Sequence, residues 1–224
     1  MTRADVVRRI MEIGIVPVVR AASGAEAIAV ADAIAEGGVQ ALEITMTVPG
    51  AVKVIADAVA RYGDRFLIGA GTVLDAEQAR AVIGAGARFV VAPIVDEETI
   101  AFCHTSGVAV LPGALTPTEV VRAWRAGADF VKVFPCSALG GPAYIKALKA
   151  PLPDIPLVPT GGVTIDTVAA FFAAGASAVG VGGDLCDVQA IRRGHPEKLV
   201  AAARAYVSAV HAARIDHNVE RKAR

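Results

Sequence analysis

The chain has 224 residues, of which 54% are hydrophobic and only 5% aromatic, and its 22 basic and 22 acidic side chains give a formal net charge of zero. A balanced charge offers no general attraction to nucleic acid or to an anionic membrane, so an anionic ligand has to be held by a local site. The length suits one large α/β domain, and an aliphatic core with few aromatics is typical of helices packed on a buried parallel sheet.

The N-terminus and the cysteines predict a soluble, cytoplasmic protein. Charged side chains are spread through residues 1–9, which therefore lack the apolar segment of a signal peptide. The longest uncharged stretch, residues 167–183, is interrupted by Gly175 and indicates a helix, a turn and a strand more than a membrane span. Three widely spaced cysteines argue against a disulfide framework and suit a reducing compartment.

Aliphatic runs alternate with amphipathic stretches along the whole chain. A helix over residues 4–13 is expected in front of the first strand. Strands are expected at residues 15–20, 41–46, 66–70, 88–92, 108–111, 129–134, 157–160 and 178–181. Helices are expected at residues 24–36, 51–62, 76–83, 97–105, 117–126, 142–148 and 165–173, with a last helix over 196–213.

Eight strands alternating with helices predict parallel pairing through right-handed crossovers and closure into a (β/α)8 TIM barrel with an N-terminal helix in front of it. An open doubly wound sheet is the main alternative, but the chain lacks the G-x-G-x-x-G turn of a dinucleotide fold. We expect a single domain over residues 1–214 and a polar, frayed tail over residues 215–224, because no linker or change of composition indicates a second domain.

Function in such a barrel collects at the carboxyl ends of the strands, where polar residues are few in this sequence. Lys132 lies in an apolar strand whose period of two places Phe130, Lys132 and Phe134 on one face. If that face is the interior, burial lowers the pKa of an amine, and a neutral amine can attack a ketone to form an imine. A lysine that reaches into solvent, or that neutralises a buried acid, would give the same pattern.

Glu43 is the natural partner of Lys132, because it also lies among aliphatic neighbours in an expected strand. Buried acids are rare unless they are paired, and a lysine–glutamate pair inside a barrel can move protons for imine chemistry. A structural ion pair with Lys132 or Arg20 would predict the same burial, so burial alone does not separate the two interpretations.

Glycine-rich segments follow the seventh and eighth expected strands, at residues 159–164 and 180–184. Loops of this kind at these two places form the phosphate site of many barrels, because glycine lets backbone N–H groups approach an oxyanion closely. Tight turns alone would explain either loop, and explain both together less readily.

No metal site or other cofactor is expected. The four histidines, at positions 104, 195, 211 and 217, fall in expected helices, loops or the tail and not at strand ends. The H-x-H and H-E-x-x-H patterns of zinc sites are absent, as is the G-x-S-x-G pattern of a serine nucleophile.

Five segments at the expected strand ends, residues 42–45, 69–74, 112–113, 131–135 and 159–163, together resemble the 2-keto-3-deoxy-6-phosphogluconate (KDPG) aldolases, a family that also covers 4-hydroxy-2-oxoglutarate aldolases. The resemblance spans about residues 15–210. It implies a class I aldolase without a cofactor, commonly a homotrimer, that cleaves KDPG to pyruvate and glyceraldehyde 3-phosphate.

The resemblance also implies roles for individual residues. Lys132 forms the Schiff base with the 2-keto acid, and Glu43 relays protons through water. The pocket would be lined by Thr72, Pro93, Phe134 and Thr160, and the phosphate would lie near the backbone of Gly161, Gly162, Gly182 and Gly183.

Other activities stay open at this point. The same chemistry could act on 4-hydroxy-2-oxoglutarate, on the galactonate epimer or on the sugar acid without phosphate. A phosphate-binding barrel isomerase or epimerase would share the glycine loops and would not need a buried lysine. An inactive oligomeric barrel would be expected to have lost Lys132 or Glu43, and both are present.

Two positions depart from the family pattern. Relatives carry an arginine shortly after the catalytic glutamate to hold the substrate carboxylate, whereas residues 46–48 contain none, and we expect Arg20 to take over. Asp184 stands near the expected phosphate, where a carboxylate about 4 Å away would cost on the order of 4 kcal/mol. If Asp184 faces the site, a substrate without phosphate is favoured; if it begins a short helix as an N-cap, it points away.

Overall fold

The computed structural model describes the backbone of residues 1–222 and the side chains of residues 1–214. The strands in this range are β1 (Ile15–Val19), β2 (Ala41–Thr45), β3 (Leu67–Gly71), β4 (Phe89–Val91), β5 (Ala109–Leu111), β6 (Gly113–Ala114), β7 (Val131–Val133), β8 (Leu157–Pro159) and β9 (Val179–Val181). The helices are α1 (Arg3–Ile13), α2 (Gly24–Glu36), α3 (Ala51–Tyr62), α4 (Ala76–Gly84), α5 (Glu97–Thr105), α6 (Pro117–Arg125), α7 (Pro142–Lys149), α8 (Val168–Ala173), α9 (Val188–Arg192) and α10 (Pro196–Lys222), with 3-10 turns η1 (Gly63–Arg65) and η2 (Cys136–Leu139).

Four of the helices that follow strands begin at a side chain that accepts a backbone hydrogen bond. Ser23, Asp75, Asp96 and Thr116 each accept the N–H of the residue three positions later. These caps satisfy amides that the first helical turn leaves unpaired. They therefore fix where the chain turns from the carboxyl end of a strand into the next helix.

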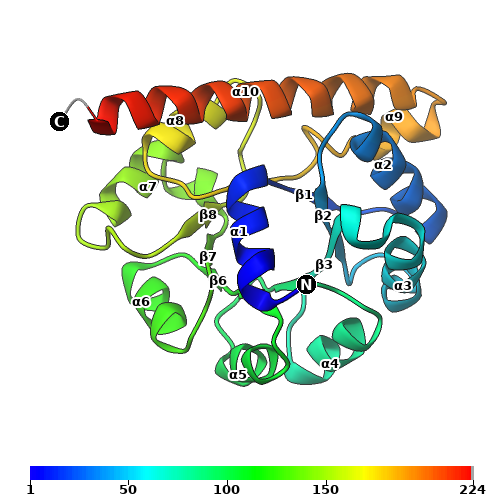
Figure 1. The fold of residues 1–224 in the computed structure, drawn as a ribbon, viewed down its shortest axis with the longest axis horizontal. Helices are drawn as coiled ribbons and strands as arrows, with labels where there is room; N and C mark the ends of the chain where they lie inside the picture. Colours follow the sequence, from blue (N-terminus) through cyan, green and yellow to red (C-terminus); the bar gives the residue numbers. More distant parts are fainter. Residues whose placement is uncertain (223–224) are drawn as a thin grey trace.

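The strand pairs are all parallel and form two sheets, one in the order β5-β4-β3-β2-β1-β9 and one in the order β6-β7-β8. The two sheets meet twice. β5 continues through Pro112 into β6, and a parallel bridge joins Thr160, directly after β8, to Gly180 in β9. The strands follow one another around the middle of the molecule with helices outside (Figure 1). This curled parallel sheet confirms the predicted α/β class.

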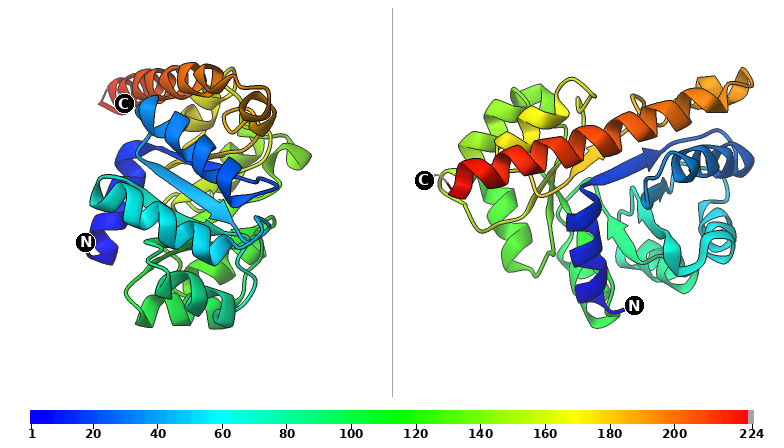
Figure 2. Two further views of the ribbon diagram at one scale, coloured as in Figure 1. Left: turned by 90° about the vertical axis from the view of Figure 1, so that its right-hand side faces the viewer. Right: turned by 45° about the horizontal axis from the view of Figure 1, so that its top comes forward.

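Helix α1 lies across the amino ends of the strands (Figures 1 and 2). Arg9 donates to the carbonyls of Asp64 and Arg65 just before β3, and Arg3 binds Asp129 just before β7. Buried apolar residues of α1 pack with inward-facing residues of the strands in one cluster: Val6, Ile10, Val16, Ala41, Leu67, Phe89, Val91, Ala109, Leu111, Phe130, Val158 and Ala178. The helix therefore covers this end of the interior and leaves the carboxyl ends of the strands for a site.

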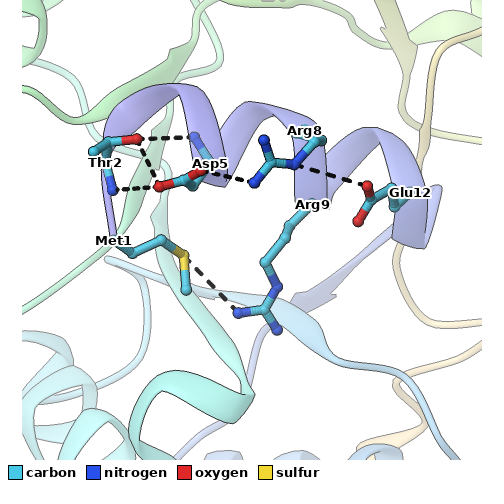
Figure 3. Close-up of polar contacts among 6 residues, drawn as sticks. All are labelled: Met1, Thr2, Asp5, Arg8, Arg9 and Glu12. Atoms are coloured by element: carbon cyan, nitrogen blue, oxygen red, sulfur yellow. Dashed lines mark hydrogen bonds and ion pairs between the residues drawn. The ribbon is translucent and has the colours of Figure 1, made fainter.

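The outer face of α1 carries its own polar contacts (Figure 3). Thr2 and Asp5 form a capping box, and Arg8 pairs with Asp5 at 2.7 Å and with Glu12 at 3.9 Å. These exposed pairs contribute little free energy, so burial of the opposite face against the strands is what holds the helix.

Several predicted boundaries differ from the structure. Helix α10 runs to Lys222, past the expected end at residue 213, because no glycine or proline follows to stop it; residues 223–224 of the expected tail lie outside the described residues. Helix α8 begins at Val168 and not at residue 165, because the Thr167 hydroxyl accepts the Thr164 N–H in a turn. Strand β6, helix α9 and both 3-10 turns were not predicted from the sequence. None of the described helices is long and apolar enough to cross a membrane.

Candidate active site

Lys132 and Glu43 meet inside the ring of strands. Lys132 is the central residue of β7 and Glu43 the central residue of β2. The Lys132 Nζ lies 4.0 Å from the Glu43 Oε1, and the two side chains are only 4% and 2% exposed. The predicted pairing of the two charged residues is therefore present, although they come from strands far apart in the sequence.

The Glu43 carboxyl group is incompletely satisfied. Its Oε1 is buried and has no hydrogen-bond partner among the described residues. Burial raises the pKa of Glu43 above its usual value, and the positive charges of Lys132 and Arg20 offset part of this rise. A buried carboxyl that is held close to an amine and kept easy to protonate is suited to accept and return protons.

Glycine makes room for the glutamate. A Cβ added at Gly71, the last residue of β3, would lie 2.5 Å from the Glu43 Oε1. Thr72 follows with a φ of 59°, which is uncommon for a β-branched residue. Backbone strain of this kind persists only where the surrounding structure holds it, and strained residues cluster at functional sites.

A cavity of about 340 Å³ opens at the carboxyl ends of the strands beside this pair. Phe134 lies between the Lys132–Glu43 pair and the cavity. Its ring centre is 5.1 Å from the Lys132 Nζ, and the residue also lines the cavity. The cavity is lined by seven of the predicted site residues and four others: Arg20, Phe134, Thr160, Gly161, Gly162, Gly182, Gly183, Val18, Val163, Thr164 and Asp184. The structure thus brings the end of β1, the β7 loop and both glycine loops together.

Four of the predicted site residues are not among those that line the cavity: the pair Lys132 and Glu43, which lies beside it, and also Thr72 and Pro93. Thr72 follows β3, next to the glycine that packs on Glu43. Pro93 lies after β4, and its backbone is so close to Gly113 that a Cβ there would come within 2.4 Å of it. Both residues stay predictions for contacts with a bound substrate.

Arg20 is the cation at the cavity. Among the residues whose side chains the structure describes, no carboxylate lies within ion-pair distance of Arg20. Its guanidinium is exposed and near enough to Glu43 to lower the pKa of that carboxyl. It is therefore available to an anionic ligand.

Asp184 lines the cavity but does not begin a helix, since the N-cap of α9 is Asp187. Its Oδ2 accepts the Ile165 N–H at 3.2 Å and also the Tyr206 hydroxyl. Of the two alternatives for Asp184, the N-cap that points away is therefore wrong, and the residue lies at the cavity. Its carboxylate is held by two donors of the protein itself.

Thr45 is fully buried in β2 two residues after Glu43, and the sequence did not lead us to predict it as a site residue. Its hydroxyl donates to the Val19 carbonyl at 3.0 Å and lies 2.7 Å from the Thr47 hydroxyl. The alternation that singles out Glu43 also places Thr45 on the inner face, so the signal was present. Within the described part of the chain, no group of three or more His, Cys, Asp or Glu residues could hold a metal ion.

Fold and site together define a parallel α/β protein with a buried lysine–glutamate pair beside a cavity at the carboxyl ends of its strands. Residues 6–202 match the family model described as KDPG and KHG aldolase. The chain belongs to this family of aldolases, which confirms the resemblance seen in the sequence.

Three similar proteins illustrate the relationship. The chain is 41% identical over 172 residues to the 2-dehydro-3-deoxy-6-phosphogalactonate aldolase of Escherichia coli K12, covering 76% of this chain and 83% of that protein. It is 40% identical over 162 residues to the 2-dehydro-3-deoxy-phosphogluconate aldolase of Pseudomonas aeruginosa, covering 72% and 73%. The KDPG aldolase of Legionella pneumophila, solved with pyruvate as a covalent carbinolamine intermediate, superposes with a TM-score of 0.80 at 28% identity, covering 86% of this chain and 93% of that one.

Proposed function

We propose that this protein is a class I aldolase that cleaves KDPG to pyruvate and glyceraldehyde 3-phosphate through a Schiff base on Lys132. The observation that carries the proposal is the buried Lys132–Glu43 pair, 4.0 Å apart, beside a cavity that contains an arginine and two glycine loops. No cofactor is needed, because the protonated imine itself withdraws electrons from the bond that breaks.

The chemistry follows from the pair. The Lys132 Nζ attacks the C2 ketone of the substrate, and loss of water from the carbinolamine gives the imine. Removal of the C4 hydroxyl proton breaks the C3–C4 bond, releases the aldehyde and moves the electron pair toward the imine nitrogen as an enamine. Protonation at C3 and hydrolysis then release pyruvate and the free amine. Glu43, whose raised pKa suits proton exchange, takes and returns these protons through water.

We also propose that the two sheets form one closed (β/α)8 barrel. The passage from β5 into β6 and the Thr160–Gly180 bridge support closure. The inner apolar cluster also supports it, because residues of β1, β2, β3, β4, β5, β8 and α1 pack there together.

The experiment that tests the function is borohydride reduction in the presence of pyruvate, followed by intact-mass measurement and peptide mapping. We expect a reduced pyruvyl adduct on Lys132 that is absent in Lys132→Ala. Lys146→Ala, which removes an exposed lysine of α7, is the matched control and should keep the adduct. Folded protein without an adduct would contradict the aldolase and favour the isomerase or the inactive barrel.

A second candidate substrate is the galactonate epimer of KDPG. The 41% identity to the Escherichia coli galactonate aldolase favours it as much as the 40% identity to the Pseudomonas enzyme favours the gluconate form. A parallel assay of the two epimers decides between them, because the product pyruvate is the same and only the configuration at C4 differs.

The active form is proposed to be a cytoplasmic homotrimer. Three buried free cysteines support a reducing compartment. Leu74 and Ile94, in the loops after β3 and β4, are 45% and 48% exposed, and large apolar side chains in neighbouring loops suit an interface between copies of the chain.

A further inference from the structure

A single carboxylate joins the two glycine loops of the cavity. Asp184 follows Gly182 and Gly183 in the loop after β9, and its Oδ2 accepts the Ile165 N–H at 3.2 Å. Ile165 belongs to the loop after β8, shortly after Gly161 and Gly162. The hydrogen bond therefore crosses from one loop to the other.

The same oxygen is also fixed from outside the loops. The hydroxyl of Tyr206, a residue of α10 that is only 1% exposed, donates to the Asp184 Oδ2. Burial, together with this hydrogen bond, raises the pKa of Tyr206, so the phenol stays a donor. Helix α10 packs along α2 and α8 on one side of the molecule (Figure 2). This packing holds Tyr206, and with it the Asp184 carboxylate, in place.

Other contacts hold each loop to its own surroundings. The Ser137 N–H donates to the Gly161 carbonyl at 3.1 Å, and the Thr167 hydroxyl donates to the Gly162 carbonyl at 3.5 Å. Gly161 and Gly162 have φ angles of 90° and 78°, which only glycine adopts without strain. The turn after Gly182 is closed by backbone bonds from Leu185 and Cys186 to the Gly182 carbonyl, which stay within that loop. Near the cavity rim, Asp184 supplies a side-chain contact that sets one loop against the other.

We propose that Asp184, held by Tyr206, is a positioning residue that fixes the spacing of the two glycine loops and thereby their affinity for the phosphate end of the substrate. The proposal rests on the proposed function. Backbone N–H groups bind an oxyanion well only when they converge on it, so a shift of one loop weakens the site. The Asp184 Oδ2 accepts hydrogen bonds from both the Ile165 N–H and the Tyr206 hydroxyl, and such donors stabilise a carboxylate.

The test compares aldol addition of pyruvate to glyceraldehyde 3-phosphate and to glyceraldehyde, which differ only in the phosphate. In Asp184→Ala and Tyr206→Phe we expect the ratio of the KM for glyceraldehyde 3-phosphate to the KM for glyceraldehyde to rise about tenfold, the effect of losing a hydrogen bond to a charged group. Asp184→Asn keeps an acceptor oxygen and should restore most of the affinity. Inhibition by inorganic phosphate should weaken in parallel with the KM change.

Tyr62→Phe is the matched control, because Tyr62 also donates to an aspartate, Asp32 at 2.7 Å, away from the cavity. It should leave the KM ratio unchanged. Tyr206→Phe removes one oxygen and keeps the buried ring, so this variant tests the contact even if Asp184→Ala unfolds.

Two results would overturn the proposal. One is an unchanged KM ratio in folded Tyr206→Phe and Asp184→Ala. The other is tighter binding of glyceraldehyde 3-phosphate in both Asp184→Ala and Asp184→Asn, which would mean that charge repulsion outweighs positioning. Failure of the proposed function is distinguishable, because it would appear as the absence of the pyruvyl adduct on Lys132 in the unaltered protein.

Discussion

Arg20 is the residue that we expect to take the place of the arginine that relatives carry shortly after the catalytic glutamate. It is exposed at the end of β1 and lines the cavity together with Phe134 and Thr160. In this position a guanidinium can bind a carboxylate with two parallel hydrogen bonds. We expect it to hold the carboxylate of pyruvate while Lys132 attacks the neighbouring ketone.

Replacement of Arg20 by alanine is expected to raise the apparent KM for pyruvate about tenfold to a hundredfold, the range for loss of a charged hydrogen-bonded contact. The apparent KM is measured from the amount of adduct that borohydride traps at increasing pyruvate concentrations. Arg8→Ala, which removes an exposed arginine of α1, is the control and should leave the KM unchanged. An unaltered KM in Arg20→Ala would show that another group binds the carboxylate.

The buried carboxyl group of Glu43 predicts a pH-dependent stability. Because burial raises its pKa in the folded state, the favourable protonated form is fully populated below the ordinary glutamate pKa and is lost as the pH rises through the raised value. Each unit of the shift corresponds to about 1.4 kcal/mol. The charged form therefore makes the folded protein less stable at neutral pH.

A Lys132→Met background isolates this effect, because the amine no longer lowers the pKa of Glu43. Adding Glu43→Gln to it is expected to raise Tm more at about pH 8 than at about pH 4. Thermal unfolding at both pH values measures the difference. Glu12→Gln in the same background controls for loss of an exposed carboxylate, and a pH-independent gain in Tm for Glu43→Gln would refute the raised pKa.

Strand β7 and helix α1 contribute to the site and to the core, respectively. β7 is only three residues long, yet it places Lys132 inward between the register partners Gly113 and Val158. α1 covers the opposite end of the interior with Val6 and Ile10. β7 thus holds the proposed nucleophile in the middle of a strand, and α1 covers the amino ends of the strands.

Truncation of the fully buried Ile10 to alanine should therefore affect stability more than chemistry. We expect the free energy of unfolding to fall by about 2–5 kcal/mol, the usual loss for a buried isoleucine. Met11→Ala, next along the helix and 38% exposed, should change it by no more than about 0.5 kcal/mol. Urea denaturation measures both, and equal losses would mean that α1 is not packed against the strands as described.

The proposed trimer can be tested through the exposed apolar loops. Ile94→Glu places a charge where an interface between copies of the chain is expected, and burial of an unpaired charge is costly. Sedimentation equilibrium should give three times the chain mass for the unaltered protein and a smaller mass for the variant. Met11→Glu, at the opposite end, should stay trimeric; a monomeric unaltered protein would contradict the trimer.

Much of the fold could be predicted because the signals are local. The expected helices over 24–36, 51–62 and 97–105 have the observed ends, since a capping serine or aspartate or a glycine marks each beginning. β6 was missed because it is only two residues long and depends on a distant contact, the pairing of Gly113 and Ala114 with Lys132 and Val133 of β7. The turn before α8 depends on a threonine hydroxyl that competes with the helix for the Thr164 amide.

The α/β class and the choice of Lys132 and Glu43 as candidate partners could be predicted from the sequence, because alternation along a strand groups the side chains that share a face. Whether that face is the interior, and which residues meet there, depends on how the strands pack. The distance of 4.0 Å between Lys132 and Glu43 and the grouping of Arg20 with both glycine loops depend on strands that are remote in sequence. The direction of the Asp184 carboxylate depends on Tyr206 in the last helix. Such contacts are set by how the elements pack, which no local pattern records.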